Sequence, residues 1–156
     1  MPELIESLLL RDEGFRRSAY QDHLGYWTIG IGKLIDARKG GGLTFTEALY
    51  LLRNEVSAKE ADIRSHLPWY DGLDEVRKAV LLSMAFQMGS MGLLAFRNTL
   101  RAVEAGRWDD AADGMLSSRW AQQTPLRAHR LATAMRTGDV AALRLDEEPP
   151  NWPRTG

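Results

Sequence analysis

The longest helical pattern in the sequence begins at a capping box and separates two stretches of different character. Thr44 and Glu47 have the spacing at which two side chains satisfy unpaired backbone amides at a helix start. Apolar residues then recur at helical intervals, which predicts a helix over about Phe45–Ser65, ended by Leu67-Pro68. We therefore expect one long helix that joins two lobes.

The stretch before this helix predicts a small lobe that contains β-structure. Apolar spacing indicates a helix over about Glu3–Arg11, with Gly14 just beyond its end. Strand-forming residues punctuated by glycines over Ala19–Gly32 indicate a hairpin or small sheet, and the glycines at 40–42 mark a turn. The segment 33–44 is too short for two further strands and their turns, so we expect a compact turn there without a second full hairpin.

The stretch after the long helix predicts an all-helical lobe. Its short helices are expected over about Asp74–Met88, Arg97–Glu104, Trp108–Ser117 and Pro125–Arg136. The predicted fold class is α+β, and a cleft between two lobes is a common place for a ligand site. We expect a single domain over 1–156, with an N-terminal lobe at 1–44, a connecting helix at 45–66, a helical lobe at 67–145 and an irregular tail at 146–156.

The composition is that of a soluble globular protein and argues against several classes of function. Hydrophobic residues make up 44% of the 156 residues, charged residues 26%, and the formal net charge is −1. This charge gives no global attraction to nucleic acid or membranes, and the lack of cysteine excludes disulfides and thiolate metal sites. The three histidines lack metal-ligand spacing. No apolar run is long enough to cross a bilayer and no secretion signal is visible, so we expect synthesis in a cytoplasm.

Two acidic residues on connecting segments, Glu13 and Asp22, are candidates for acid–base chemistry. Glycosidases need two carboxyl groups of unlike pKa across one bond, one protonated and one ionised. The pair alone is a weak signal, since the chain holds 21 acidic residues and these two also suit a helix end and a turn. Gly30 and Gly32 lack the third glycine of a nucleotide-binding loop, which favours a close approach of the backbone to a ligand or a strand.

Several motifs follow one another in a fixed order over about Leu4–Gly138. They are Asp12–Gly14, Tyr20–Asp22, Gly25–Gly32, Tyr70–Asp74, Phe86–Gly89, Arg107–Asp109, Ser118–Trp120 and Gln123–Ala128. Together they resemble the phage-type lysozymes, glycoside hydrolase family 24, and within that family the enzymes of the T-even phages. A match of this breadth is far more specific than any one motif.

The resemblance implies a muramidase that hydrolyses the β-1,4 bond between N-acetylmuramic acid and N-acetylglucosamine in bacterial peptidoglycan, with no cofactor and no metal. It implies that Glu13 is the general acid and that Asp22 and Thr28 flank the attacking water. This arrangement implies inversion at the anomeric carbon, for which the two carboxyl groups stand about 6.5–9.5 Å apart.

The resemblance also assigns substrate contacts and a supporting residue in the rest of the chain. The family's glycan contacts correspond to Leu34, Phe86 and Thr99, the last of which is serine in the T-even phage enzymes. A further contact corresponds to Gly114, which has no side chain to offer. Arg127 corresponds to an arginine near the catalytic glutamate.

Two features of charge leave alternatives open. Lys33 replaces a histidine that pairs with an acid at the position of Glu55, so it either forms a Lys33–Glu55 pair or is solvated. The region 114–138 has no acid but holds arginines, which predicts either a cationic surface that faces the wall or an ordinary solvated helix face. These arginines are Arg119, Arg127, Arg130 and Arg136. We interpret Trp108 and Trp120 as core residues rather than sugar-stacking platforms.

The implied biological role is that of an endolysin of phage or prophage origin. We expect a monomer in the host cytoplasm, without nucleic-acid binding or stable membrane insertion. It would act on the wall in the periplasm after a holin-type protein permeabilises the inner membrane. Two alternatives stay open: a lytic transglycosylase, against which Asp22 and Thr28 argue, and a non-catalytic glycan-binding module, against which Glu13 argues as well.

Overall fold

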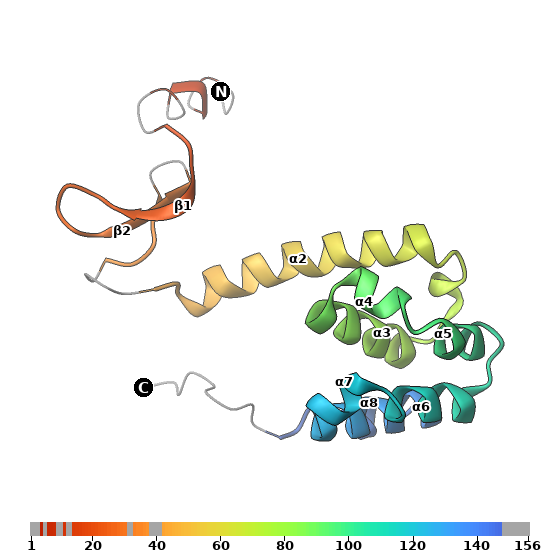
Figure 1. The fold of residues 1–156 in the computed structure, drawn as a ribbon. Helices are drawn as coiled ribbons and strands as arrows, with labels where there is room; N and C mark the ends of the chain where they lie inside the picture. Colours follow the sequence, from red (N-terminus) through yellow and green to blue (C-terminus); the bar gives the residue numbers. More distant parts are fainter. Residues whose placement is uncertain are drawn as a thin grey trace. The chain divides into compact units, whose positions relative to one another are not determined.

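The computed structural model describes residues 4, 6–8, 11, 14–30, 33–37 and 42–147. The chain divides into two compact units, 1–52 and 53–156, and the boundary falls inside the long helix. The first unit contains a small sheet and the second is helical (Figure 1), so the predicted α+β class is confirmed. Helical residues at 4, 6–8 and 11 agree with the helix expected near the N-terminus. The division of the domain into four parts stays a prediction, and the tail from residue 148 onward lies outside the described residues.

The sheet of the first unit has three antiparallel strands in the order β1-β2-β3. They are β1 (Arg16–Gln21), β2 (Trp27–Gly30) and β3 (Lys33–Leu34). The hairpin expected over Ala19–Gly32 is therefore confirmed, with Tyr20 opposite Thr28 in its register. Gly30 ends β2 with a φ of 68°, a conformation that glycine adopts without the steric cost of a Cβ atom.

The segment 33–44 differs from the expected turn at its beginning. Lys33 lies opposite Ile29 and Leu34 opposite Thr28, so β2 and β3 form a second, very short hairpin. This two-residue strand pairs back onto β2 and is not a full hairpin inside the segment, so the expectation of a compact turn over 33–44 stays a prediction. Farther on, residues 35–37 and 42–44 form no strand, and the Gly42 amide donates to Asp36 Oδ2 at 3.0 Å, which closes the segment. Residues 38–41 lie outside the described part.

The long helix is α2 (Phe45–His66), and its capping box is confirmed. The Thr44 amide donates to Glu47 Oε2 at 3.0 Å, and the Glu47 amide donates to Thr44 Oγ1 at 3.2 Å. Lys33 Nζ lies 2.6 Å from Glu47 Oε1, and this contact holds the pKa of Glu47 below its ordinary value. The observed partner of Lys33 is thus Glu47, whereas the predicted partner, Glu55, belongs to the other unit.

The second unit contains short helices after the end of α2. They are η1 (Tyr70–Gly72), α3 (Glu75–Met88), α4 (Ser90–Leu94), α5 (Arg97–Glu104), α6 (Trp108–Leu116), α7 (Arg119–Gln123), α8 (Pro125–Thr137) and η2 (Val140–Leu143). The four expected helices correspond to α3, α5, α6 and α8 and are confirmed within a residue or two. The others have at most five residues, too few to show a helical period in the sequence. Among the described residues, no helix has the length and apolarity to span a membrane.

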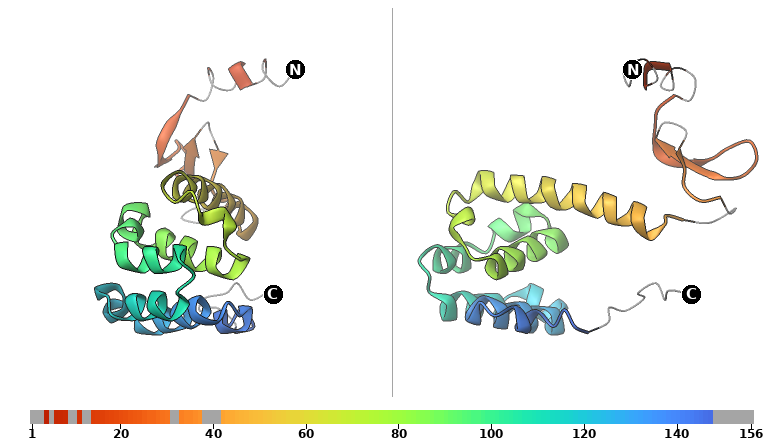
Figure 2. Two further views of the ribbon diagram at one scale, coloured as in Figure 1. Left: turned by 90° about the vertical axis from the view of Figure 1, so that its right-hand side faces the viewer. Right: turned by 180° about the vertical axis from the view of Figure 1, so that it is seen from behind.

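The core of the second unit is built where α6 and α8 lie side by side (Figure 2). Small residues are buried on both helices, which favours a close approach of the two backbones. They are Ala111 and Ala112 on α6 and Ala128 and Ala132 on α8. Larger buried side chains from α3, such as Leu81 and Met84, fill the remaining space. Trp120 is buried in this core and Trp108 packs against it, as the sequence predicted.

Arg77 connects three helices of the second unit. Its Nε donates to the Met135 carbonyl at 2.8 Å and its Nη2 to the Arg136 carbonyl at 3.1 Å, both in the last turn of α8. Its guanidinium also lies 3.9 Å from the ring centroid of Trp108, at the start of α6, and contacts Asp74 Oδ2 at 2.9 Å. A cation thus satisfies carbonyl groups that a helix leaves unpaired at its C-terminus.

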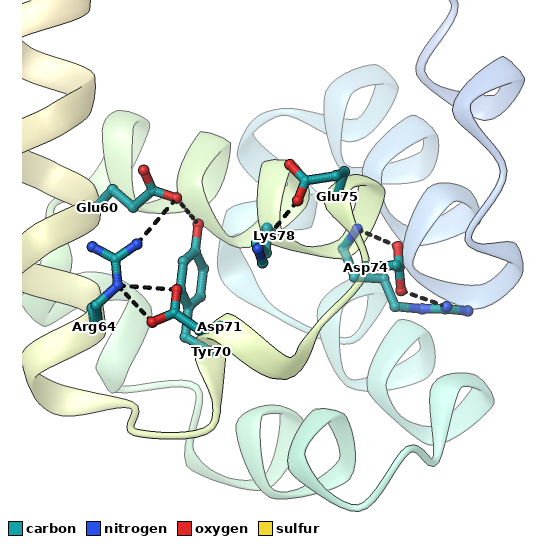
Figure 3. A network of polar contacts seen from close by, with 8 residues as sticks. Glu60, Arg64, Tyr70, Asp71, Asp74, Glu75 and Lys78 are labelled. Atoms are coloured by element: carbon teal, nitrogen blue, oxygen red, sulfur yellow. Dashed lines mark hydrogen bonds and ion pairs between the residues drawn. The ribbon is translucent and has the colours of Figure 1, made fainter.

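A polar network fixes the end of α2 to η1 (Figure 3). Arg64 Nε contacts both carboxylate oxygens of Asp71, at 3.0 and 2.8 Å. The fully buried Tyr70 donates its hydroxyl to Glu60 Oε1 at 3.0 Å. Burial first, and then this bond to Glu60, raises the pKa of Tyr70, so the phenol stays protonated and keeps the contact.

Candidate active site

The turn between β1 and β2 holds Asp22 in place. Asp22 follows β1 directly, and its Oδ1 accepts hydrogen bonds from the amides of Leu24 and Tyr26, both at 2.9 Å. Its own amide donates to the Tyr26 carbonyl at 2.8 Å. This is the local pattern for which aspartate is favoured in turns, because its short side chain bonds to the backbone just ahead of it. The carboxylate position is therefore set by the hairpin itself.

The same hydrogen bonds keep Asp22 ionised. Donation from the Tyr26 amide is the largest cause that holds the pKa of Asp22 below its ordinary value, and the Leu24 amide adds to it. Desolvation works in the opposite direction but is outweighed. Both of these hydrogen bonds use Oδ1, and within the described residues Oδ2 accepts none. One carboxylate oxygen thus builds the turn and the other is available to a ligand.

Thr28 lies beside Asp22 in the hairpin. It is only 6% exposed, and its Oγ1 donates to the Tyr26 carbonyl at 3.4 Å. That distance is long for a hydroxyl donor, so the bond is weak. Because the Asp22 amide donates to the same carbonyl, both candidate residues converge on Tyr26. Leu34, opposite Thr28 in the sheet and exposed, joins them as the predicted glycan contact of this unit.

Glu13, the predicted general acid, lies outside the described residues. The structure therefore brings together Asp22, Thr28 and Leu34, while the position of the acid stays a prediction. Among the described residues, no group of three histidine, aspartate or glutamate side chains has the arrangement of a metal site.

In the second unit, Arg127 joins α8 to α3, the helix that also carries Phe86. Arg127 Nη2 donates to Ser83 Oγ at 2.9 Å and to the Ser83 carbonyl at 3.2 Å. Burial of the guanidinium, and secondarily the charge of Arg130, lowers the pKa of Arg127. Phe86 follows Ser83 by about one helical turn and is 40% exposed, as a ligand contact requires. The predicted support of the catalytic glutamate by Arg127 stays a prediction.

Thr99 and Gly114 line two adjoining hollows of about 590 and 350 Å³ over α5 and α6. Thr99 is only 5% exposed, and a Cβ atom added at Gly114 would overlap its Oγ1. The two departures from the family at these positions are therefore linked. With the Thr99 hydroxyl in this orientation, a side chain at position 114 would meet it.

Sequence reasoning placed Trp120 in the core but gave no role to its partner Gln87 or to Arg97. Trp120 Nε1 donates to Gln87 Oε1 at 2.9 Å, and the rings of Trp120 and Phe96 meet edge to face at 6.2 Å. Arg97 opens α5 and lines the larger hollow with Arg119. The sequence did contain one signal for Arg97. It is a cation in the first turn of a helix that has no acid there, whereas helix starts usually favour acidic side chains.

The arginines of region 114–138 do not form a single group. As a set they fit neither the predicted cationic surface nor the predicted solvated helix face. Arg136 contacts Asp109 Oδ1 at 3.0 Å and Asp113 Oδ1 at 2.9 Å, and these contacts raise its pKa. The acids that this region lacks are thus supplied by α6. Since Arg127 is engaged with Ser83, neither of these two arginines is a free cation on a helix face. The prediction that Arg136 contributes charge to wall binding was based on the missing acids and is weakened accordingly.

Comparisons with known proteins agree on one family. The sequence profile of the phage lysozymes matches residues 11–134. The "Probable T4-type lysozyme 1" of Dictyostelium discoideum is 31% identical over 92% of this chain and 100% of its own length. The pre-baseplate central spike protein Gp5 of Enterobacteria phage T4 is 32% identical over 92% of this chain, which spans 29% of that protein. The peptidoglycan hydrolase gp36 of Pseudomonas phage phiKMV is 31% identical over 81% of this chain and 14% of its own length.

Proposed function

Because the chain belongs to the phage lysozyme family, we propose that it is an endolysin that hydrolyses the β-1,4 bond between N-acetylmuramic acid and N-acetylglucosamine in bacterial peptidoglycan. The observation that carries the proposal is the family match over 11–134, which includes the hairpin with Asp22 and Thr28. The relative named as a peptidoglycan hydrolase supports the same substrate.

In the proposed mechanism, Glu13 gives a proton to the leaving sugar oxygen while a water attacks from the opposite face. Asp22 takes the proton of that water, and Thr28 holds the water in line. The lowered pKa of Asp22 supports its ionised role, and its Oδ2 is the oxygen available to the water. The long bond from Thr28 to the Tyr26 carbonyl supports a hydroxyl that turns readily toward a water.

The first experiment tests the general acid. Glu13→Gln keeps the size of the side chain but removes its proton donor, so we expect clearing of a purified peptidoglycan suspension to be abolished. The thermal melt should stay close to that of the wild type. Lysis at the wild-type rate by purified Glu13→Gln protein would refute the assignment.

The second experiment separates the charge of Asp22 from its part in the turn. Asp22→Asn keeps an oxygen that accepts from the amides of Leu24 and Tyr26, whereas Asp22→Ala loses it. If the carboxylate acts on water, both variants should lose about 100-fold or more in rate, in the range of general acid–base catalysis. Near-normal activity of Asp22→Asn with loss in Asp22→Ala would show that Asp22 serves the turn alone.

The third experiment identifies the products and separates the alternatives. Hydrolysis with inversion gives a free reducing end that is initially the α anomer. Thr28→Val should impair turnover more than glycan binding. An initial β anomer would leave the muramidase reading intact but defeat inversion, and an anhydro product detected by mass spectrometry would indicate a lytic transglycosylase.

The proposed biological setting follows from the same family. The protein would act as a monomer that waits in the host cytoplasm and reaches the wall in the periplasm after a holin-type protein opens the inner membrane. Expression in a bacterial host should therefore be tolerated until the inner membrane is permeabilised, and lysis should follow. Lysis on expression alone would contradict this setting while leaving the enzymatic proposal in place.

A further inference from the structure

We propose that the bond between Asp71 and Gly72 is a covalent modification site, at which the aspartate isomerises to isoaspartate, and that Arg64 restrains this reaction. Asp71 and Gly72 belong to η1, the short helix between α2 and α3. All three residues lie in the second unit, and the reaction consumes no glycan, so the inference is independent of the proposed hydrolase.

The reaction needs an aspartate that is followed by an unshielded amide. The Gly72 nitrogen attacks the side-chain carboxyl carbon of Asp71, and a C–N bond forms. The amide proton, the acid proton and one carboxyl oxygen leave together as water, which gives a five-membered succinimide ring. Water then adds to a ring carbonyl, and opening at the main-chain carbonyl gives isoaspartate. One water leaves and one enters, so no other reactant is required.

The first observation is that glycine follows aspartate at position 72 without a steric need for it. The sequence contains two Asp-Gly pairs, Asp71–Gly72 and Asp113–Gly114. Among the described residues, no heavy atom lies within 4 Å of a Cβ atom built on Gly72, whereas one built on Gly114 would meet the Thr99 hydroxyl. Since glycine has no Cβ atom to shield its amide, the first pair is intrinsically reactive. Both of its residues are exposed, so water reaches the bond.

The second observation is that a guanidinium holds the reacting carboxylate. Arg64 Nε contacts both carboxylate oxygens of Asp71, at 3.0 and 2.8 Å (Figure 3). Ring closure requires this carboxyl group to turn toward the Gly72 nitrogen and to carry a proton, because its oxygen leaves as water. Arg64 opposes both steps. It fixes the carboxylate in place, and its hydrogen bond is the largest cause that lowers the pKa of Asp71.

The third observation is that the backbone around the bond opens at little cost. The Gly72 amide donates to the Trp69 carbonyl at 3.1 Å, in a 3-10 helix of three residues. Such helices are short and have poorer hydrogen-bond geometry than α-helices, and exposed short elements open locally without unfolding of the domain. Once this turn opens, the contact with Arg64 is what still keeps the Asp71 carboxylate away from the freed amide.

The second Asp-Gly pair has the same kind of partner in a different backbone. Arg136 Nη2 lies 2.9 Å from Asp113 Oδ1. Gly114 is inside α6, however, between the fully buried Ala112 and Met115. Its amide is freed only when a helix of the core unfolds. Asp113–Gly114 is therefore expected to stay unmodified in the folded chain, which makes it an internal reference for the site at Asp71.

Isomerisation at this position would loosen the end of α2. Isoaspartate adds one methylene group to the main chain directly after Tyr70, which is fully buried and donates to Glu60 Oε1 at 3.0 Å. It also moves the carboxylate that Arg64 contacts. We therefore expect the modified fraction of the protein to melt at a lower temperature than the unmodified fraction.

The test measures isoaspartate in the full chain, incubated without peptidoglycan near neutral pH and below its melting transition. An isoaspartate methyltransferase with labelled S-adenosylmethionine quantifies the product, and fragmentation of peptides by mass spectrometry locates it. We expect isoaspartate to accumulate at Asp71 and not at Asp113 in folded wild type, and at both positions in urea. No isoaspartate at Asp71 in the folded chain, or earlier accumulation at Asp113, would overturn the proposal.

Two variants test the parts given to Arg64 and Gly72. Arg64→Met should speed the reaction at Asp71 by about three- to tenfold, which corresponds to the loss of one exposed ion pair with two contacts. Gly72→Ala should suppress it, because a methyl group shields the attacking amide and meets no described neighbour. An unchanged rate in either variant would refute the role of that residue.

Two controls separate this effect from general destabilisation. Arg107→Gln removes the same charge from an exposed arginine that contacts Asp110, which no glycine follows, and should leave the rate at Asp71 unchanged. Asp113 reports on unfolding of the helical unit. If isoaspartate rises at Asp113 in parallel with Asp71 in Arg64→Met, the substitution acts by unfolding the unit, and the proposed restraint by Arg64 is refuted.

Discussion

Replacement of Arg77 tests how the helical unit is held together. Arg77→Met keeps the apolar stem but removes the donors to the Met135 and Arg136 carbonyls and the cation over Trp108. The side chain is only 11% exposed, so solvent compensates little. Each bond from a charged donor contributes about 1.5–3 kcal/mol, and the ring contact about 0.5–1 kcal/mol. Allowing for water that reaches the freed carbonyls, we expect a loss of about 3 kcal/mol in the free energy of unfolding.

Thermal and urea denaturation measure this loss directly. For a chain of this size, about 3 kcal/mol corresponds to a decrease of roughly 6–12 °C in Tm. Arg77→Lys should lie between the wild type and Arg77→Met, because an ammonium group keeps the charge but lacks the planar fork. Lys78→Met is the neighbouring control: its partner Glu75 is almost fully exposed, and such pairs contribute about 0–1 kcal/mol. A loss below about 1 kcal/mol in Arg77→Met, or one no larger than in Lys78→Met, would refute the role given to Arg77.

The remaining predictions concern single side chains. Ser90→Ala should raise Tm, because the buried Ser90 hydroxyl has no hydrogen-bond partner in the described part of the chain. Removing this hydroxyl leaves no other donor or acceptor unpaired. A lower Tm would show that the hydroxyl makes a stabilising hydrogen bond. Arg64 lowers the pKa of Asp71 below 3.8, so this pair stabilises the fold above pH 3.8 and loses its effect as the pH falls through the lowered value. The difference in Tm between wild type and Asp71→Asn should therefore shrink on acidification, and a constant difference would contradict the pairing. Arg136→Gln should lower Tm, because it breaks two ion pairs, yet leave the salt dependence of wall binding nearly unchanged. Arg130→Gln should reduce that salt dependence. A pull-down at rising salt in which Arg136→Gln has the larger effect would refute this difference between the two arginines.

The elements that the sequence predicted well are those with a local physical cause. Thr44 and Glu47 form the capping box that their spacing indicates, and Pro125 begins α8, where its missing amide costs nothing. The hairpin around Asp22 and Thr28 was likewise visible, because strand formers and glycines alternate within a few residues.

The features that the sequence did not predict depend on contacts between distant residues. The acids that neutralise Arg136 lie more than 20 positions earlier, on α6, and no local pattern connects them. From the sequence, Gly114 was interpreted only as the loss of a glycan contact. Its contact with Thr99 joins α6 to α5 and becomes visible only when the two helices are packed together. The short helices α4 and α7 were missed because their boundaries are set by packing rather than by periodicity.

The contact between Thr99 and Gly114 also restricts the order in which the two positions are able to change. With threonine at position 99, any side chain at position 114 meets its hydroxyl, so a first step at 114 is penalised. A first step from Thr99 to alanine removes the hydroxyl that a side chain at position 114 would meet. A first step to serine removes only the γ-methyl group, which gives the hydroxyl more freedom to turn away from position 114. Mutational paths through this pair are therefore directional: libraries that vary position 114 alone should recover almost only glycine, while libraries that vary both should recover larger residues at 114 together with smaller ones at 99.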